Sequence, residues 1–176
     1  MEHVMIDLET LGRRAGCSIL SIGAVAFDPK TGRLGPELYV VVNRLSCFNL
    51  SLHEDPETVK WWEGQNAEAK KILAEVDGGG EQLPAALAKL TEYLAQFGHK
   101  KVKVWGNGSD FDNAILTACY AAIGQNIPWD FWNNRCYRTM KSLKPAVKLK
   151  RQGTYHNALD DAKSQAQHLL DLKLLG

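Results

Sequence analysis

The sequence predicts an α/β protein in which one mixed sheet of five strands carries helices on both faces. Two observations lead to this fold class. Three strand-like runs open the chain, and their short connections are typical of an antiparallel meander. The remainder alternates helical and strand-like segments, a pattern typical of parallel strands joined by crossover helices. The first strand is therefore expected near the middle of the sheet, with the later strands parallel to it.

The three opening strands are expected at residues 4–8, 19–27 and 38–42. The second run, ILSIGAVAF, is almost wholly apolar or small, which predicts a central strand that is buried on both faces. The motif DPKTG at residues 28–32 places proline and glycine in turn-forming positions. The second and third strands should therefore form a hairpin.

A change of hydrophobic period marks the helices that follow. Asp55 is a candidate N-cap with Pro56 at the first helical position, and apolar residues at helical spacing then continue to Val76. A break in this helix is expected at Gly64. Further helices are expected at residues 83–97, 111–123 and 157–174, a strand at 101–105, and a short strand followed by a turn or helix within WDFWNNRCYRTM.

The bulk properties are those of one cytoplasmic domain spanning residues 1–176. Apolar residues make up 45% of the chain, enough for a sizeable core. No apolar run approaches the roughly 20 residues of a membrane helix, and no signal peptide is visible, so no membrane partner is expected. The four cysteines are widely spaced and form no C-x-x-C pair, which favours a reducing compartment.

Charge is unevenly distributed, although the net charge is only +1. Between residues 131 and 155 the chain contains no acid and seven basic residues: Arg135, Arg138, Lys141, Lys144, Lys148, Lys150 and Arg151. Such a run is either a solvated loop or a patch that binds phosphates. The two interpretations stand equally unless a neighbouring site requires an anion.

The first strand contains two acids within HVMIDLETLG. Asp7 and Glu9 are two residues apart, so they share one face of the strand while the apolar residues share the other. Taken alone, this alternation favours an ordinary half-buried strand. A strand that is flanked by strands and covered by helices has no solvent-exposed face, however. Two acids on such a strand require an explanation, because burial of unpaired charges is costly. The alternative is half of a metal site.

Two further acidic clusters lie at the starts of expected helices. Asp110 and Asp112 follow the fourth strand, and His156, Asp160 and Asp161 precede or open the last helix. Each cluster has a structural interpretation, since Asp110 is a good N-cap and Asp160 suits the first turn of a helix. An isolated histidine is also more often structural than catalytic.

Together the three clusters indicate a metal site. In open α/β sheets ligands bind beyond the carboxyl ends of the strands, which is where these acids are expected. Carboxylates gathered there would repel one another and take up protons without a cation. Mg²⁺ and Mn²⁺ prefer such oxygen ligands, and two ions about 4 Å apart stabilise in-line phosphoryl transfer. A histidine, with an ordinary pKa near neutrality, can accept a proton from the attacking water.

The ordered motifs resemble those of a known family. The chain resembles the DEDDh 3′–5′ exonucleases, the proofreading-exonuclease-like branch of the RNase H-like superfamily. The motifs that carry the resemblance are D-x-E at Asp7 and Glu9, F-D at Phe111 and Asp112, and H-x-A-x-x-D from His156. The spacings of roughly 100 and 50 residues also fit. The W-W-x-x-Q run in TVKWWEGQ further resembles a small bacterial and phage subgroup of 3′–5′ exoribonucleases and related exonucleases.

The resemblance implies a role for each motif residue. Asp7 would bridge two divalent ions, Mg²⁺ or Mn²⁺. Glu9 and Asp161 would complete the site of the ion that carries the nucleophilic water, and Asp112 would hold the second ion. His156 would be the general base. The sequence GNGSDFD departs from the H-N-A that many relatives show before F-D, which weakens any inference about substrate contacts there.

The resemblance also implies a place for the substrate. Thr10, Leu11 and Gly12 would receive the 3′-terminal nucleotide through backbone amides and an apolar wedge, although core packing explains Leu11 equally well. Trp61 lies off the apolar stripe of its helix, so Trp61 and Gln65 are candidates to stack on or hydrogen-bond a base.

An anionic substrate makes phosphate binding the favoured interpretation of the basic run, with Arg138 as its leading residue. Trp62 falls on the apolar stripe of the same helix as Trp61 and is expected in the core.

The sequence thus predicts a two-metal 3′–5′ exonuclease that converts single-stranded ends of RNA, DNA or both to nucleoside 5′-monophosphates. Two alternatives remain at this point: an inactive nucleic-acid-binding module on the same fold, and another metal-dependent phosphohydrolase. The complete set of four acids with His156 favours the exonuclease. Because relatives are often homodimers, the resemblance is also compatible with a homodimer.

Overall fold

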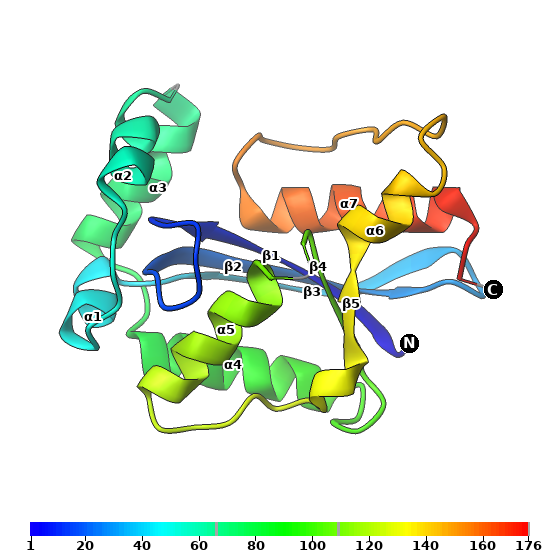
Figure 1. Cartoon of the computed structure of the whole chain (residues 1–176), viewed down its shortest axis with the longest axis horizontal. Helices are drawn as coiled ribbons and strands as arrows, with labels where there is room; N and C mark the ends of the chain where they lie inside the picture. Colours follow the sequence, from blue (N-terminus) through cyan, green and yellow to red (C-terminus); the bar gives the residue numbers. More distant parts are fainter. Residues whose placement is uncertain (66, 109, 176) are drawn as a thin grey trace.

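The computed structural model describes residues 1–65, 67–108 and 110–175 and confirms the mixed sheet (Figure 1). The five strands lie in the order β3-β2-β1-β4-β5. Their bounds are β1 His3–Thr10, β2 Ile19–Asp28, β3 Arg33–Val41, β4 Lys103–Gly106 and β5 Asn134–Cys136. The pairs β1–β2 and β2–β3 are antiparallel, whereas β1–β4 and β4–β5 are parallel. The first strand is therefore central, as its sequence predicts.

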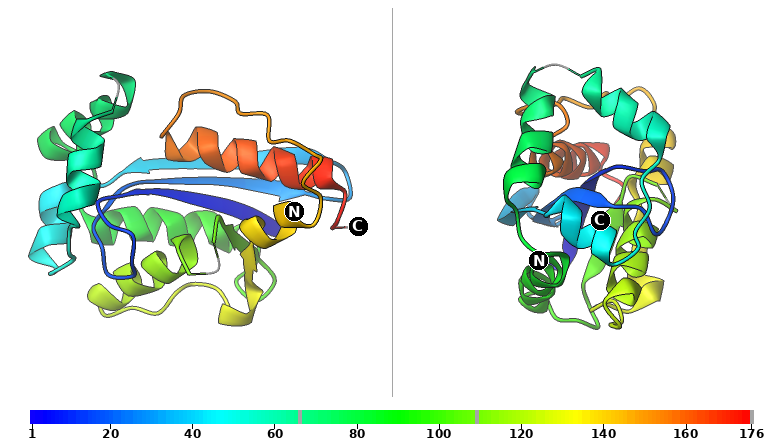
Figure 2. Two further views of the ribbon diagram at one scale, coloured as in Figure 1. Left: turned by 45° about the horizontal axis from the view of Figure 1, so that its top comes forward. Right: turned by 90° about the vertical axis from the view of Figure 1, so that its left-hand side faces the viewer.

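Helices cover both faces of the sheet (Figures 1 and 2). One face packs against α7 and α6, and the opposite face packs against α4 and α5. The bounds of these helices are α4 Leu83–Ala95, α5 Asp112–Ala122, α6 Tyr137–Ser142 and α7 Ala158–Leu172. Alternation along β1 divides its side chains between the two cores, since Val4 and Ile6 face α4 and α5 while Met5 faces α7.

Three helices gather at the end of the sheet where β1 finishes, on the left of Figure 1. They are α1 Arg44–Asn49, α2 Pro56–Glu63 and α3 Ala67–Gly78. The break expected at Gly64 is present, because α2 ends at Glu63 with Gly64 as its C-cap. With the starts of α5 and α7 at this same end, the carboxyl end of β1 is surrounded by helices.

The structure corrects three local expectations. The short helix α1 was not predicted; its cap is Asn43, whose side chain accepts a hydrogen bond from the Ser46 amide. Strand β3 begins at Arg33 rather than Leu38 and contains Pro36, which an edge strand tolerates because one side of its backbone is unpaired. Asp110 is not the N-cap of α5, because Phe111 occupies that position and Asp110 is exposed.

Within the part of the chain that the structure describes, no helix combines the length and the apolar character needed to cross a bilayer.

Candidate active site

Carboxylates from three distant segments converge beside the end of β1. Asp7 and Glu9 project from β1 on the face that α7 covers, and their exposed fractions are 9% and 8%. Asp112, the first residue of α5, is 1% exposed, and Asp161 lies in the first turn of α7. The charges of Asp112, Glu9 and Asp161 all act on the carboxyl group of Asp7. The three motifs predicted from the sequence therefore meet in one place.

A glycine in β2 allows α7 to approach this place. Gly23 is paired with Asp7 across the β1–β2 ladder, so both residues face the same side of the sheet. A Cβ atom on Gly23 would lie 2.1 Å from the carbonyl carbon of Ala158, at the start of α7. The helix thus begins directly against the sheet and brings Asp161 to the acids of β1.

Backbone amides hold Asp112 in position. Its two carboxylate oxygens accept hydrogen bonds from the amide of Leu8 at 3.2 Å and from the amide of Asn107 at 2.7 Å. These donors belong to β1 and to the loop after β4, so one side chain links the two strand ends. The same contacts explain why Asp112, rather than Asp110, is directed into the site.

Gln165 is a site residue that the sequence did not single out. Its Nε2 atom donates to Oδ1 of Asp7 at 2.7 Å, and its side chain is buried. Gln165 is four residues after Asp161, so both lie on the same face of α7. That spacing from a candidate ligand was the available signal.

Burial and mutual repulsion raise the pKa values of the acids. Desolvation, followed by the charges of Asp112, Glu9 and Asp161, raises the pKa of Asp7 well above its ordinary range. Desolvation and the charges of Asp161 and Asp112 raise the pKa of Glu9 to about 8. Burial raises the pKa of Asp112 to about 6, although the Asn107 and Leu8 amides oppose this shift. A cluster of this kind favours a bound cation, because a cation relieves the repulsion that otherwise raises these pKa values.

The loop before α7 brings a histidine and an arginine to the cluster. One potential ligand atom from each of Glu9, His156 and Asp161 lies within 4.8 Å of the others. The guanidinium of Arg151 forms an ion pair with Asp161 and lies 4.6 Å from the ring centre of Tyr155. Arg151 belongs to the predicted basic run, but its contact with a candidate ligand was not predicted.

Asp160 fastens this loop to α7. Its carboxylate accepts a hydrogen bond from the Thr154 amide at 2.8 Å, two residues before His156. Asn157 is the N-cap of α7, and its side chain accepts from the amides of Leu159 and Asp160. Asp160 therefore acts on the position of His156 rather than as a helix cap.

His156 lies against the tryptophan pair of α2. Its ring centre is 5.0 Å from that of Trp61 and 5.9 Å from that of Trp62, and both contacts are edge-on. Trp62 is 1% exposed, as predicted for a core residue, and its Nε1 atom donates to the Thr10 carbonyl at 2.9 Å. His156 also has a positive φ of 61°. Its backbone therefore adopts a conformation that few non-glycine residues adopt, which is frequent at functional sites.

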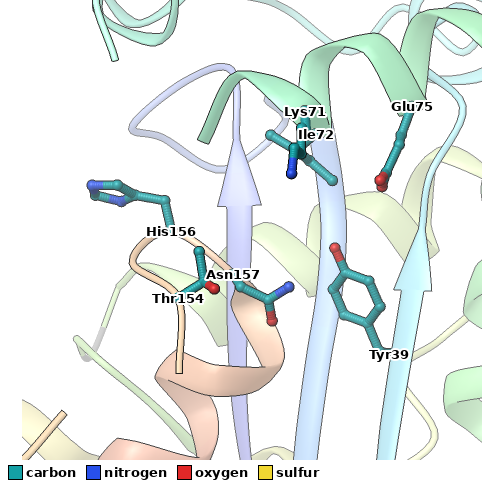
Figure 3. Close-up of a pocket in the computed structure, with 7 residues that line it drawn as sticks. All are labelled: Tyr39, Lys71, Ile72, Glu75, Thr154, His156 and Asn157. Atoms are coloured by element: carbon teal, nitrogen blue, oxygen red, sulfur yellow. The ribbon is translucent and has the colours of Figure 1, made fainter. Parts of the chain in front are cut away.

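One pocket is lined in part by His156, and a second is lined in part by its neighbours Trp61 and Trp62. The first, of about 190 Å³, lies between α3, β3 and the loop before α7, and Figure 3 shows the His156 ring directed away from its Lys71 and Tyr39 walls. The other, of about 500 Å³, is lined by Leu8, Glu9, Thr10, Gly12, Arg13, Glu57, Thr58, Trp61, Trp62 and Phe111. The larger pocket contains an acid of the cluster, so it is the better candidate for a substrate.

Not all predicted substrate residues line the larger pocket. Thr10, Gly12 and Trp61 do. Leu11 is fully buried with Leu20 and Trp62, a position that agrees with the packing interpretation. Gln65 follows the C-cap of α2, and its side-chain amide donates to the carbonyl of Trp61 in that helix at 3.1 Å.

Arg138 lies beside the loop that follows β4, close to Asp112. Its guanidinium donates to the Asn107 carbonyl at 2.8 Å, and its charge lowers the pKa of Asp112. The side chain is exposed, so a phosphate near Asp112 could reach it.

The donor set fits hard divalent cations. Four carboxylates, from Asp7, Glu9, Asp112 and Asp161, supply oxygen ligands of the kind that Mg²⁺ and Mn²⁺ prefer. Three of them are buried, and the pKa of each is raised, as expected for acids that share a site for positive charge.

Comparisons with known proteins agree with this geometry. The family profile described as the 3′-5′ exoribonuclease Rv2179c-like domain matches residues 2–172. The chain is also 25% identical over 165 residues to a protein of Enterobacteria phage T4 named exodeoxyribonuclease, in a match that covers 79% of this chain and 70% of the phage protein.

Solved structures share the fold. The nuclease domain of 3′hExo, a DEDDh family member bound to rAMP, has a TM-score of 0.63 at 15% identity and covers 96% of this chain and 90% of its own. Exonuclease X in complex with 5′ overhanging duplex DNA has a TM-score of 0.60 at 16% identity, with 97% and 90% covered. E. coli Exonuclease I in complex with a dA16 oligonucleotide has a TM-score of 0.66 at 14% identity, with 98% and 41% covered. At these identities the similarity concerns the fold.

Proposed function

The chain belongs to the Rv2179c-like family of 3′–5′ exoribonuclease domains, and from this membership we propose that it shortens single-stranded nucleic acid from the 3′ end. It is a 3′–5′ exonuclease of the DEDDh type that acts on nucleic acid. One observation carries the finer proposal. Four carboxylates and one histidine, from three separate parts of the chain, lie together beside a pocket of about 500 Å³.

Membership of the DEDDh exonucleases implies dependence on metal ions. We assign two divalent ions, Mg²⁺ or Mn²⁺, to the four acids: Asp7 would bind both, Glu9 and Asp161 would bind one, and Asp112 would bind the other. When bound, such ions supply positive charge that activates a water molecule and stabilises the reacting phosphate. The raised pKa values of the acids support this assignment, because the cluster lacks enough positive charge of its own.

His156 is the proposed general base. It would accept a proton from the attacking water at a ring nitrogen, while the water oxygen bonds to phosphorus and the bond from phosphorus to O3′ breaks. The O3′ atom takes up a proton, which leaves a shortened strand with a 3′ hydroxyl and a nucleoside 5′-monophosphate. The edge-on contacts with Trp61 and Trp62 restrict the imidazole ring, which favours one orientation for proton transfer.

The terminal nucleotide would occupy the larger pocket. Thr10 and Gly12 form its floor beside Glu9, and Trp61, which is 45% exposed, offers an aromatic surface to the base. Arg138 and Arg151 lie near Asp112 and Asp161 respectively, where they could contact phosphates. The exposed ring of Trp61 supports a single-stranded end as the substrate, because an unpaired base is free to stack on it.

The proposal includes both RNA and DNA. The family profile describes an exoribonuclease, whereas the phage T4 relative is named an exodeoxyribonuclease. A direct comparison therefore tests the function. The protein is incubated with RNA and DNA strands labelled at the 5′ end, with Mg²⁺, with Mn²⁺ or with chelator. Shortening of at least one polymer from its 3′ end, only with metal, is the expected result.

The same assay separates the alternatives. Binding of a labelled strand without shortening in either metal would contradict the enzyme and support an inactive binding module. Release of phosphate from small esters, with both polymers left intact, would support another phosphohydrolase.

We further propose that residues 1–176 form one exonuclease domain located in the cytoplasm. All four cysteines are free thiols and three of them are buried, in agreement with a reducing compartment. The homodimer that the resemblance allows is tested by sedimentation of the purified chain at several concentrations.

A further inference from the structure

Two large aromatic side chains are exposed outside the carboxylate cluster. Phe131 and Trp132 have exposed fractions of 69% and 64%, and their ring centres are 5.0 Å apart in an edge-on arrangement. They lie in the short 3-10 helix Phe131–Asn133, directly before β5. Neither residue belongs to a core cluster of the described chain, so core packing does not account for them.

Basic residues lie beside this aromatic pair. The Asn133 side chain donates to the Lys100 carbonyl at 3.0 Å, and the His99 ring is 2.9 Å from the Pro128 carbonyl. These two contacts join the loop before β4 to the segment that contains the aromatic pair. The two segments adjoin at the lower right of Figure 1, in green and yellow. Lys100 and Lys101, both exposed, therefore lie on a loop whose backbone contacts Asn133, the residue that follows the pair.

Arg135 connects the pair to the basic run. Its guanidinium donates to the carbonyls of Trp132 and Asn134, both at 2.9 Å. Asp130 is the one acid between residues 128 and 155. We call Lys100, Lys101, Phe131, Trp132 and Arg135 the β5 patch. It combines positive charge with aromatic faces, which is the chemistry that binds single-stranded nucleic acid without sequence preference.

A second exposed apolar pair, on α1, lacks this combination of aromatic faces and positive charge. Leu45 and Phe48 on α1 have exposed fractions of 63% and 67%, but they border a hollow that also contains Glu54 and Asp77. Arg44, the one cation among the described residues that line the hollow, forms ion pairs with both acids. Charge complementarity with a phosphate backbone therefore favours the β5 patch.

We propose that the β5 patch binds nucleotides of the substrate strand upstream of its 3′ end, an inference that rests on the proposed exonuclease function. The parallel register joins Val104 to Asn134 and Gly106 to Cys136, so Phe131 and Trp132, which precede β5, lie at the opposite end of β4 and β5 from Asn107. The strands alone separate the two ends by roughly 10 Å. Arg138 contacts Asn107 at the far end of this path. A strand held at the acids must therefore extend beyond its terminal nucleotide to reach the aromatic pair.

The length of the substrate tests this inference. Hydrolysis is measured with a dinucleotide and with single strands of increasing length, for the wild type and for a variant with Phe131→Ala and Trp132→Ala. The variant should have a KM at least about 5-fold higher for long strands, since loss of one stacked base costs that much or more. Its kcat on long strands and its kcat/KM on the dinucleotide should be unchanged. Lys100→Ser with Lys101→Ser should also reduce the salt dependence of binding to long strands.

The matched control is Leu45→Ala with Phe48→Ala, which removes similar exposed apolar area from the acidic hollow and should leave KM unchanged at every length. Equal KM values for the wild type and the β5 variant on long strands would overturn the inference. A wild-type dimer that the β5 variant converts to monomer would also overturn it, because a second copy would then cover the patch.

A binding measurement keeps this inference separate from the proposed function. Fluorescence anisotropy of a labelled long strand is recorded in chelator, where no hydrolysis is expected. One outcome is that no polymer is shortened in any metal, while the β5 variant binds the long strand more weakly than the wild type does. The proposed function would then be wrong, and the inference about the β5 patch would be supported. If hydrolysis occurs and binding does not depend on the patch, the inference alone fails.

Discussion

Gly23 and Ala158 approach each other so closely that a hydrogen atom is the only side chain that fits between them. A Cβ on Gly23 would lie 2.1 Å from the Ala158 carbonyl carbon and 2.2 Å from the Leu159 nitrogen. Both neighbours are backbone atoms, so no side-chain rotation can make room. The position of α7 on the sheet, and with it the position of Asp161, depends on this contact.

Gly23→Ala should therefore displace the start of α7. Overpacking of this kind costs about 1–3 kcal/mol of unfolding free energy, and exonuclease activity should fall further than the loss of folded protein explains. Urea unfolding and turnover at a temperature where the variant is folded measure the two effects. Gly64→Ala is the control, because a Cβ there would be 3.4 Å from its nearest neighbour. Full activity in Gly23→Ala would show that Asp161 does not depend on the contact.

Asp7→Asn should remove activity while the fold is retained. The asparagine keeps an oxygen that can accept the Gln165 hydrogen bond, but it removes the charge that Glu9, Asp112 and Asp161 repel. Turnover should fall by about 10³-fold or more, corresponding to several kcal/mol of transition-state stabilisation. In chelator the variant should unfold at a higher temperature than the wild type.

Added Mg²⁺ or Mn²⁺ provides the companion measurement for Asp7. Because a ligand that binds the folded state raises its stability, metal should raise the Tm of the wild type more than that of Asp7→Asn. Equal shifts in the two proteins would mean that Asp7 is not a metal ligand.

His156→Asn should separate proton transfer from metal binding. Asparagine tolerates the positive φ at this position better than most residues, so the loop should keep its shape. Removal of a general base typically lowers kcat by about 10²–10⁴, whereas the metal-induced rise in Tm should persist. A kcat within a few-fold of the wild type would exclude His156 as the base.

The pH dependence of stability should contain a contribution from His3. Nε1 of Trp105 donates to Nδ1 of His3 at 3.0 Å, and burial is the largest cause that lowers the pKa of His3 from 6.5 to about 4. As the pH falls below 6.5, the unfolded chain takes up a proton that the folded chain does not, until about pH 4. The contribution is therefore complete above pH 6.5 and is lost between pH 6.5 and pH 4.

His3→Gln isolates this contribution, because its side-chain oxygen can still accept the Trp105 hydrogen bond but does not titrate. The free energy of unfolding, measured in urea between pH 7 and pH 4, should decline less steeply in the variant than in the wild type. Parallel curves for the two proteins would refute the assignment, since both share the titration of the acidic cluster.

Sequence patterns predicted the parts of the fold that depend on local periodicity. The alternation of Asp7 and Glu9 indicated their common face, and the helical spacing before Val76 indicated α2 and α3 with a break at Gly64. Contacts between distant segments left little local signal. Gly23 looked like any small residue in a buried strand, because its function depends on α7.

The error at Asp110 has a related origin. A carboxylate before a helix is normally a cap, yet α5 begins at Asp112, whose own side chain binds the amides of Leu8 and Asn107. The donors lie on another strand and loop, so no pattern within residues 106–113 shows them. Gln165 has one local signal, its spacing of four residues from Asp161, but its partner Asp7 is at the other end of the chain.

Asp112 also links β1 to the loop after β4 beyond the point where β1 and β4 stop pairing. The ladder between β1 and β4 ends at Met5 and Trp105, and beyond it the amides of Leu8 and Asn107 both turn to the one carboxylate. An asparagine at position 112 would present only a single acceptor oxygen, leaving one of these two amides opposite an NH₂ group. The two carboxylate oxygens of Asp112 therefore have a structural function as well as a proposed metal-binding one. A substitution at this position would remove a charge and would also loosen the end of β1, which positions Glu9.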